Sequence, residues 1–434
     1  MSEQTLVAIV GCVAVLVLML IRVPIAVCLG SVAVAGFAYL VGPEPALGIL
    51  IDSPIRTVTN FNFSVVPMFI LMGALVGASG MSRELFRAAN AWVGHMPGGM
   101  AIATVLACGG FAAINGSSVA SAATMTQVAL PEMRRMGYDP GLSAGVVAAG
   151  GTLGIMIPPS VMFILYAILT ETDVASLFIA GIIPGLIAVF MYCVTILIIY
   201  QVKREWLPRG ARADCRERLE SLRDVWATLV LFVMVMGGIY GGFVTITEAA
   251  GVGAMGAFVI GVARGRLRWR EIVESLVEAL RTSAAIFFIL IAAFLFQYFL
   301  AVTQMSQLLG DFLVSLPVGP LGVVIVILAF YIIAGMVVDE IAMVLLTIPI
   351  FFPIVVGLGF DPIWFGVLVV VTIEIGLIAP PVGIICFIMN TMVPDIGLVN
   401  IYKGAMPFVV ADIFWLALLL AFPGLSLFLV HMMG

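Results

Sequence analysis

The chain has 434 residues, of which 63% are hydrophobic and 10% are charged; its net charge is −5 and its mean hydropathy is +1.25. A soluble core cannot absorb that much apolar surface, and the apolar runs do not alternate with polar residues as barrel strands do. The composition therefore predicts an all-α polytopic membrane protein. The cysteines and histidines show no spacing typical of a disulfide framework or a metal site.

Apolar runs of about 20 residues predict the membrane spans. In chain order they cover 5–21, 24–41, 64–80, 141–168, 175–200, 225–242, 246–264, 283–303, 362–391 and 405–430. Two further apolar regions, 101–133 and 318–357, each carry a polar or acidic interruption near the middle and a proline at the exit. These regions are predicted to be re-entrant hairpins, which enter and leave on one side of the membrane.

Basic residues predict the orientation, because cytoplasmic loops are enriched in lysine and arginine. Segments 201–223 and 263–271 are strongly basic, whereas 41–54, 170–176 and 303–312 read as acidic loops. The N-terminus is therefore predicted outside, with the first hairpin entering from the cytoplasm and the second from outside. We interpret 201–223 as a linker that sets the topology, and no nucleic-acid binding is expected.

An internal repeat runs through the sequence. GYDP at 137–140 and GFDP at 359–362 are 222 residues apart, and GIMIPP at 154–159 and GLIAPP at 376–381 keep that offset. Such repeats are frequent in secondary transporters. An odd number of predicted spans separates the copies, so they are predicted to have opposite orientations, with hairpins that point toward each other. Each Asp-Pro pair is predicted to begin a helix.

Segments 150–160 and 372–383 combine glycines with a Pro-Pro pair, so each is predicted to be an unwound helix within the membrane. Free carbonyls at such breaks suit a hard cation, and exposed helix N-termini attract anions. The tip of the first hairpin offers neutral oxygens, and the second tip, 335–343, offers acids, which at membrane depth are functional candidates. These tip residues are Asn115, Ser117, Ser118 and Ser121, with Asp339 and Glu340 opposite Ser117 and Ser118 in the repeat.

Less specific interpretations stay open for several of these features. The small residues of the first tip also favour close helix packing, and Pro-Pro pairs can be simple kinks. Glu374, inside the second break, is either an ion ligand or a structural acceptor for hairpin N–H groups. Asp412 is expected near the membrane–water interface.

With these motifs placed, the chain resembles the large membrane subunit of a tripartite ATP-independent periplasmic (TRAP) transporter over essentially its full length. The segments that carry the resemblance are NGSSVASAATM (115–125), GGTLGIMIPPS (150–160), GGFVTITEAAGVGA (241–254), GMVVDEIAM (335–343) and GLIAPPVG (376–383). The resemblance implies import across the bacterial inner membrane by an ion-driven elevator mechanism, in which two hairpins and two broken helices slide against a scaffold. It implies no organic cofactor.

The resemblance also implies partners. A periplasmic binding protein would deliver an organic acid such as a C4-dicarboxylate or a sialic acid. A small four-helix membrane subunit would join the scaffold, and because this chain begins directly with its first span, that subunit is expected as a separate chain. Since no arginine or lysine lies in the predicted tips or breaks, an anionic substrate would depend on helix N-termini, hydroxyl groups and bound Na⁺.

Carried over by position, the resemblance implies two or more sodium sites, each between a hairpin tip and the facing break. The first would use Asn115, Ser117, Ser118 and carbonyls between Gly151 and Met156. The second would use carbonyls near Gly335, with Asp339, Thr372 and carbonyls between Ile375 and Ile378. The substrate is expected between the tips, with candidate contacts Ser118, Ser121, Glu340, Pro158 and Pro380.

These expectations divide the chain into successive parts. They are scaffold helices at 1–63; a first repeat at 64–200, with hairpin 101–133 and broken helix 141–168; a basic linker at 201–224; scaffold helices and an amphipathic connector at 225–282; and a second repeat at 283–434, with hairpin 318–357 and broken helix 362–391.

Other functional classes fit less well. A stand-alone sodium–carboxylate symporter of a related elevator fold shares the hairpins and breaks and remains the alternative. A pure scaffold subunit would not need two broken, polar helix pairs. An intramembrane enzyme is not expected, because GLGFD at 357–361 has the wrong spacing for an aspartyl protease and the HExxH and GxxxxGK[ST] motifs are absent.

Overall fold

Helices make up the regular structure of the computed structural model, which describes residues 3–210 and 212–433. The first helices are α1 (Glu3–Leu20), α2 (Ile25–Val41), α3 (Pro43–Thr59) and, after a 3₁₀ turn (Phe61–Ser64), α4 (Val65–Ala78). Helix α3 covers most of a segment predicted to be a loop, so that prediction was wrong. Gly42, at φ +121°, turns the chain sharply after α2, and Pro43 suits the first turn of α3.

The first hairpin and first broken helix follow. The hairpin consists of α6 (Gly99–Asn115) and α7 (Ser118–Arg135), and the broken helix of α8 (Pro140–Met156) and α9 (Val161–Thr170). Helices α5 (Met81–Val93) and α10 (Val174–Val202) flank them. As predicted, an Asp-Pro pair begins α8, where the Asp139 carboxylate accepts a hydrogen bond from the Leu142 N–H at 2.8 Å.

The second half repeats this order. After a 3₁₀ turn (Arg204–Trp206) it comprises α11 (Cys215–Asp224), α12 (Trp226–Phe232), a π-helical turn (Val233–Gly237), α13 (Gly238–Tyr240), α14 (Ile246–Ala263), α15 (Trp269–Thr303), α16 (Met305–Ser315), α17 (Gly319–Gly335), α18 (Glu340–Gly357), α19 (Pro362–Ile378), α20 (Ile384–Met392), α21 (Leu398–Ala421) and α22 (Gly424–Met433). The Asp361 carboxylate caps α19 as Asp139 caps α8.

Two expected boundaries differ from the structure. The division at 282/283 falls inside α15, a continuous helix of 35 residues, because 269–303 contains no glycine or proline to interrupt it. The span expected at 405–430 is two helices, α21 and α22, because Pro423 lacks the N–H that would continue the first.

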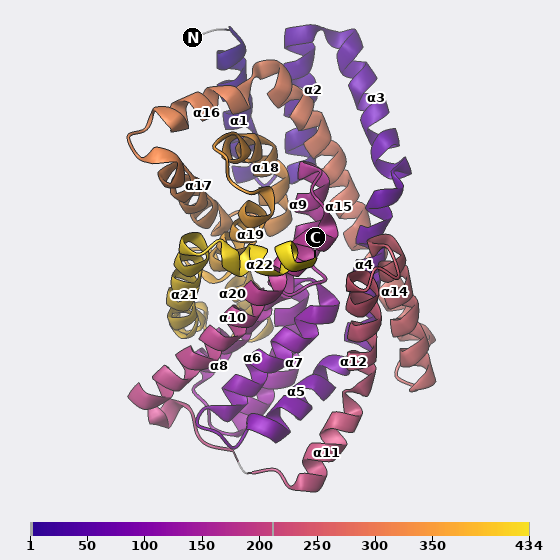
Figure 1. Ribbon diagram of the computed structural model, residues 1–434, viewed down its shortest axis with the longest axis vertical. Helices are drawn as coiled ribbons and strands as arrows, with labels where there is room; N and C mark the ends of the chain where they lie inside the picture. Colours follow the sequence, from indigo (N-terminus) through magenta and orange to yellow (C-terminus); the bar gives the residue numbers. More distant parts are fainter. Residues whose placement is uncertain (1–2, 211, 434) are drawn as a thin grey trace.

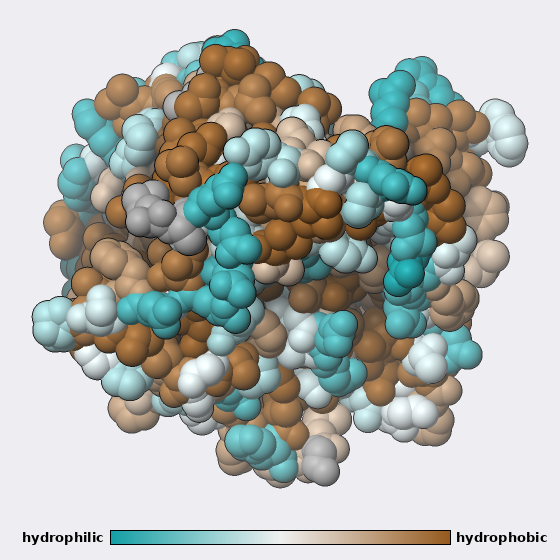
Figure 2. Space-filling view, turned by 90° about the horizontal axis from the view of Figure 1, so that it is seen from above, coloured by the Kyte–Doolittle hydropathy of each residue, from teal (hydrophilic) through white to brown (hydrophobic). Residues whose placement is uncertain are grey.

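The helix lengths agree with a multi-pass membrane protein. Among the described residues, seven helices are long and apolar enough to cross a membrane, or eight if the bent pair of α11 with α12–α13 is one span. Large apolar side chains on the outer helices are exposed, including Val10, Ile51 and Phe190, as lipid contact requires. The end face near the N-terminus mixes hydrophilic and hydrophobic residues (Figure 2).

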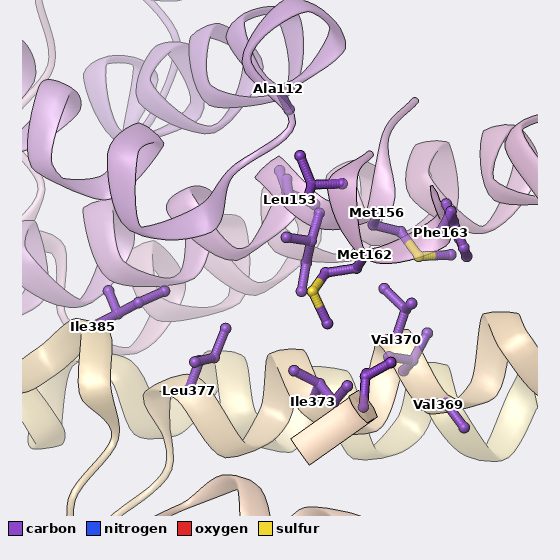
Figure 3. Packing of buried hydrophobic residues seen from close by; sticks show 14 of the residues in the cluster. Ala112, Leu153, Met156, Met162, Phe163, Val369, Val370, Ile373, Leu377 and Ile385 are labelled. Atoms are coloured by element: carbon purple, nitrogen blue, oxygen red, sulfur yellow. The ribbon is translucent and has the colours of Figure 1, made fainter. Parts of the chain in front are cut away.

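The hairpins α6–α7 and α17–α18 lie in opposite halves of the molecule (Figure 1). The α6–α7 half includes α11, which follows the basic linker, whereas the N-terminus lies at the other end (Figure 1). The two broken helices lie between the hairpins. Figure 3 shows Leu153 and Met162, from α8 and α9, facing Ile373 and Leu377 of α19, so an apolar layer joins the two halves of the sequence.

A paired charge holds the amphipathic helix α5 against α14. The Arg264 guanidinium donates two hydrogen bonds of 2.8 Å to the Glu84 carboxylate, and the side chains are 19% and 11% exposed. Arg266 lies 3.6 Å from the same carboxylate. A bidentate, mostly buried ion pair of this kind is stronger than an exposed one.

We predict that Glu84→Gln lowers the unfolding free energy by about 1–3 kcal/mol, because it removes the charge that Arg264 pairs with in a mostly buried position. Thermal unfolding of the detergent-solubilised protein measures the change. Glu132→Gln is the matched control, since Glu132 pairs with Arg135 at the surface and exposed pairs contribute about 0–1 kcal/mol. Equal effects of the two substitutions would contradict the assignment.

Candidate functional site

The two hairpin tips meet through a direct hydrogen bond. The Ser118 hydroxyl donates to the Glu340 carboxylate at 2.8 Å, and both side chains are buried. These residues are 222 positions apart, which is the offset of the sequence repeat. The contact therefore joins equivalent positions of the two copies, as the prediction that the hairpins point toward each other requires.

The first tip is a compact polar turn. The Asn115 amide donates to the Ser117 carbonyl at 3.3 Å and to the Ser121 hydroxyl at 3.2 Å. Gly116, at φ +66°, lets the chain reverse between α6 and α7, and the Ser117 hydroxyl caps α7 by accepting from the Ala120 N–H at 3.4 Å. The sequence-predicted residues of this tip therefore lie together in the structure.

The second tip has the same design with an acid in place of the serine. The Asp339 carboxylate caps α18 by accepting from the Ile341 and Ala342 N–H groups at 3.1 and 3.4 Å. Asp339 and Ser117 are the equivalent positions predicted from the repeat, and each begins the second helix of its hairpin. Asp339 is exposed, whereas the following residue, Glu340, is buried.

Each tip is bonded to the break of its own half. The Val161 N–H, just after the first break, donates to the Gly116 carbonyl at 3.4 Å, and the Gly383 N–H donates to the Met336 carbonyl at 3.2 Å. Val161 and Gly383 are again 222 residues apart. These bonds satisfy backbone groups that would otherwise be unpaired within the membrane.

Equivalent glycines bring tip and break into contact. A methyl group added at Gly154 would lie 2.5 Å from the Ser117 carbonyl oxygen, and one at Gly376 would lie 2.6 Å from the Gly335 carbonyl carbon. Neither position therefore accepts a larger side chain without displacing the tip. Of the tip residues predicted for the first site, Ser117 and Ser118 lie against Gly154 just before break one, whereas Asn115 lies against Gly73 of α4. Gly335 lies against Gly376 just before break two.

The breaks are shorter than predicted. Helix α8 continues to Met156 and α19 to Ile378, so the irregular stretches are 157–160 and 379–383 rather than 150–160 and 372–383. The early glycines serve packing instead: Gly151, a predicted ligand, lies within α8 against Ala122 of α7. Pro158 is buried in the first break, whereas Pro380 is exposed in the second.

Some carbonyl oxygens near the tips have no backbone N–H group one helical turn later from which to accept a hydrogen bond. Pro158 cannot donate to the Gly154 carbonyl, and Pro380 cannot donate to that of Gly376. Thr372, buried one turn before Gly376, keeps its lone pairs while its hydroxyl donates to the Leu368 and Val369 carbonyls. The Ile375 carbonyl instead accepts from the Ala379 N–H at 3.0 Å. Neutral carbonyl and hydroxyl oxygens of this kind are the ligands that a hard monovalent cation binds.

The structure differs from the sequence predictions for two acids, Glu374 and Asp412. Glu374 is fully buried and neither of its oxygens has a hydrogen-bond partner, so it is not a structural acceptor for hairpin N–H groups. Asp412 is fully buried within α21, beside the Tyr192 hydroxyl, so the expectation of a position near the membrane–water interface is wrong. The sequence shows that both are acids in apolar runs, but not that they lie on facing helices.

An ion pair outside the membrane-spanning helices links the two halves. Arg134, at the end of α7, donates to Asp395 in the loop 393–397 at 2.8 Å. This hydrogen bond lowers the pKa of the Asp395 carboxyl. The base of the first hairpin is thereby tied to the loop that follows the second broken helix.

A cavity of about 410 Å³ opens beside the first tip. Its walls include Asn115 and Ser117 from the tip, Glu340 from the second hairpin and Gly73 from α4. The opposite wall is α15, which contributes Glu271, Glu274 and Glu278. No arginine or lysine lines the cavity among the described residues, so the lining is acidic, with Glu274 paired to Arg270 outside it.

The α15 acids were missed as site residues. Their spacing of three and four positions, which places them on one helix face, could have found them in the amphipathic connector. A larger cavity of about 960 Å³ lies between α3, the loop 171–173 and α15. It contains none of the sequence-predicted site residues, so we place the candidate site at the tips.

The arrangement of helices matches that of a known membrane transporter. The YdaH transporter of Alcanivorax borkumensis has a TM-score of 0.63 with this chain, at 14% identity, and the match covers 88% of this chain and 89% of that one. At such low identity the match shows the fold alone.

Comparison with known sequences identifies the protein family. Residues 12–425 match the family described as the DctM component of the tripartite ATP-independent periplasmic transporter. The C4-dicarboxylate TRAP transporter large permease of Pseudomonas aeruginosa is 38% identical over 91% of this chain and 94% of its own length. The sialic acid TRAP transporter large permease of Vibrio cholerae is 29% identical, covering 86% and 87%, and the 2,3-diketo-L-gulonate permease of Escherichia coli is 31% identical, covering 83% and 84%.

The chain therefore belongs to the DctM family, the large permease component of TRAP transporters. This confirms the resemblance seen in the tip and break motifs. Because its relatives are transport permeases, the expectation that the chain is not an enzyme is also confirmed. The roles of the individual tip and break residues stay predictions.

We predict that Ser118→Ala lowers the unfolding free energy by about 1–3 kcal/mol, because it leaves buried Glu340 without its donor. In the double variant with Glu340→Gln, the two effects should not add, since the residues contact each other. Thermal unfolding of the four proteins of this cycle measures the coupling. Ser31→Ala, which removes only hydrogen bonds to the Val27 and Cys28 carbonyls within α2, should have little effect. Additive effects in the cycle would contradict the contact.

Proposed function

We propose that this chain imports an organic acid across the bacterial inner membrane, together with Na⁺. A periplasmic binding protein delivers the substrate, and a small four-helix membrane subunit joins the scaffold. The observation that carries the proposal is the cavity at the hairpin tips, whose walls come from both hairpins and from α4 and α15. Membership of the TRAP family supports the partners and the class of substrate.

The charge of the cavity supports cation coupling. Four glutamates line it with no base in the lining among the described residues, although Glu274 pairs with Arg270. Such an acidic lining disfavours a carboxylate substrate on its own. Sodium ions held by the tips and breaks would supply the missing positive charge. The N-termini of α7 and α18, which begin at the tips, would add attraction for the anion.

The position of the cavity supports an elevator movement. It is lined on one side by the hairpin tips and on the other by α4 and α15, which pack on each other. We infer that α6–α9 and α17–α20 carry the substrate past a scaffold formed by α1–α4 and α12–α15. In such a movement, Asn115 would lie close to α4 in only one position of the moving helices. The alternative is a stand-alone symporter of related fold, which the uptake measurement below distinguishes.

We predict uptake of labelled organic acids into proteoliposomes that hold this chain and its small partner, with purified binding protein outside and an inward Na⁺ gradient. Ser117→Ala and Asp339→Asn should reduce uptake, because each removes an oxygen from a tip. Thr195→Val, which alters only a bond within α10, is the control. Uptake without the binding protein would favour the stand-alone symporter. Uptake that responds to pH but not to Na⁺ would contradict sodium coupling.

We predict that Gly73→Ala slows uptake, whereas Gly77→Ala, one turn further along α4, does not. A methyl group at Gly73 would lie 2.7 Å from the Asn115 side-chain oxygen, but one at Gly77 meets nothing within 4 Å. Overpacking of about 1–3 kcal/mol would change the population of this conformation by roughly 5- to 150-fold. Initial uptake rates at equal protein amounts measure the effect, and equal rates for the two variants would count against a moving tip at α4.

A further inference from the structure

Helix α11 exposes apolar side chains on one face of an otherwise charged helix. Leu219 is 68% exposed and Leu222 is 45% exposed, and Trp226 at the start of α12 is exposed as well. Their spacing of three and four residues places them on the same helix face. Neither the candidate site nor the proposed function uses this apolar stripe. Because contact of such a stripe with water is unfavourable, it indicates a contact with something outside the chain.

The apolar stripe is continuous with the outer surface of α12. Leu229, Val230 and Val233 follow Trp226 at the same helical spacing and are exposed. Helix α11 meets α12–α13 at a bend of 43°, so it leaves the line of the apolar span while its stripe stays joined to that surface. The stripe thus ends at the face of the molecule that the basic loops predict to be cytoplasmic. A helix placed in this way lies at the membrane–water boundary, where its apolar face contacts lipid.

The charged residues of α11 are sorted around the apolar stripe. With about 3.6 residues per turn, the bases flank the stripe on its two sides, and the acids lie on the opposite side of the helix. The bases are Arg216, Arg218 and Arg223, and the acids are Glu217, Glu220 and Asp224. Bases beside an apolar face can place their charges among lipid headgroups, and negative headgroups attract them. The charge pattern therefore favours an anionic lipid over a zwitterionic one.

Arg218 provides a specific anchor for such a headgroup. Its guanidinium carbon lies 5.8 Å from the centre of the Trp92 ring on α5, and α5 packs against α11. The Nε and Nη2 atoms of Arg218 are buried, yet neither has a hydrogen-bond partner within the part of the chain that the structure describes. Buried donors are normally paired, and the planar guanidinium matches the oxygens of a phosphate group. The geometry therefore fits a phosphate beside Trp92.

The acids of α11 do not satisfy Arg218. Asp224 accepts a hydrogen bond from Arg87 of α5 at 3.4 Å, and Glu220 lies 2.8 Å from Arg216. The third acid is on the side of the helix turned away from the stripe. Arg218 therefore keeps its capacity for an anion that the described residues do not supply.

We propose that α11 and the end of α5 bind an anionic glycerophospholipid of the cytoplasmic leaflet. The lipid phosphate accepts hydrogen bonds from the Arg218 guanidinium, and the acyl chains lie along the stripe from Leu222 through Trp226 to Leu229. Trp92 and Trp226 are exposed beside this site, as aromatic side chains at a membrane–water boundary commonly are. The site shares no residue with the cavity at the hairpin tips and does not depend on the proposed function.

Thermal unfolding of the full chain in detergent, with increasing amounts of phosphatidylglycerol or of phosphatidylcholine, tests the proposal. A lipid that binds the folded state raises the unfolding temperature as its concentration rises, and we expect phosphatidylglycerol to raise it more. Arg218→Gln should weaken the apparent affinity for phosphatidylglycerol about tenfold, because it removes the charge and its fork of donors. Arg135→Gln, which removes an exposed base outside the site, is the matched control and should leave that affinity unchanged.

Equal shifts with the two lipids, or a phosphatidylglycerol shift that Arg218→Gln leaves intact, would overturn the proposal. A shift that inorganic phosphate reproduces would assign Arg218 to a free anion and overturn the lipid site. Loss of the shift in the complex with the small membrane subunit would assign the stripe to that protein and also overturn it. If Arg218→Gln does not fold, Leu222→Ser takes its place, and native mass spectrometry should show less retained phosphatidylglycerol than in the wild type; equal retention would contradict the site.

Discussion

Every backbone N–H and carbonyl within a membrane must find a partner inside the protein, and the two tip–break contacts of this chain meet that requirement. A hairpin tip or a helix break alone would leave unpaired groups. Here Val161 bonds to Gly116 and Gly383 bonds to Met336, while Gly154 and Gly376 let the backbones approach. Irregular backbone, with its free oxygens, can therefore exist at the centre of the molecule, and the candidate site depends on it.

The same constraint explains the charge distribution. The tips supply neutral oxygens and two acids, the cavity wall on α15 supplies three more acids, and the cavity lining described here contains no base. The acidic lining is the reason for our proposal that cations take part in binding an organic acid.

The sequence predicted the hairpins, both breaks and hairpin tips that point toward each other, because the repeat offset relates equivalent residues directly. It did not predict the direct contact between Ser118 and Glu340. It did not predict where the breaks begin. Gly150 and Gly151 indicate a helix break when only the sequence is considered, but in the structure they allow α6 and α7 to pack closely against α8. It missed α3, since Pro43 and Pro45 suit a loop as well as a first helical turn. It misplaced Asp412 and left Glu374 undecided, because burial in these helices depends on tertiary packing and not on local pattern.

The central claim is that each tip–break contact holds a cation. The most direct test is equilibrium binding of radioactive sodium to the purified protein and to variants at each tip, without substrate or partners. The account predicts saturable binding of more than one ion, with Ser117→Ala and Asp339→Asn each weakening a different part of the isotherm. Absence of saturable sodium binding, or binding that neither variant changes, would contradict it.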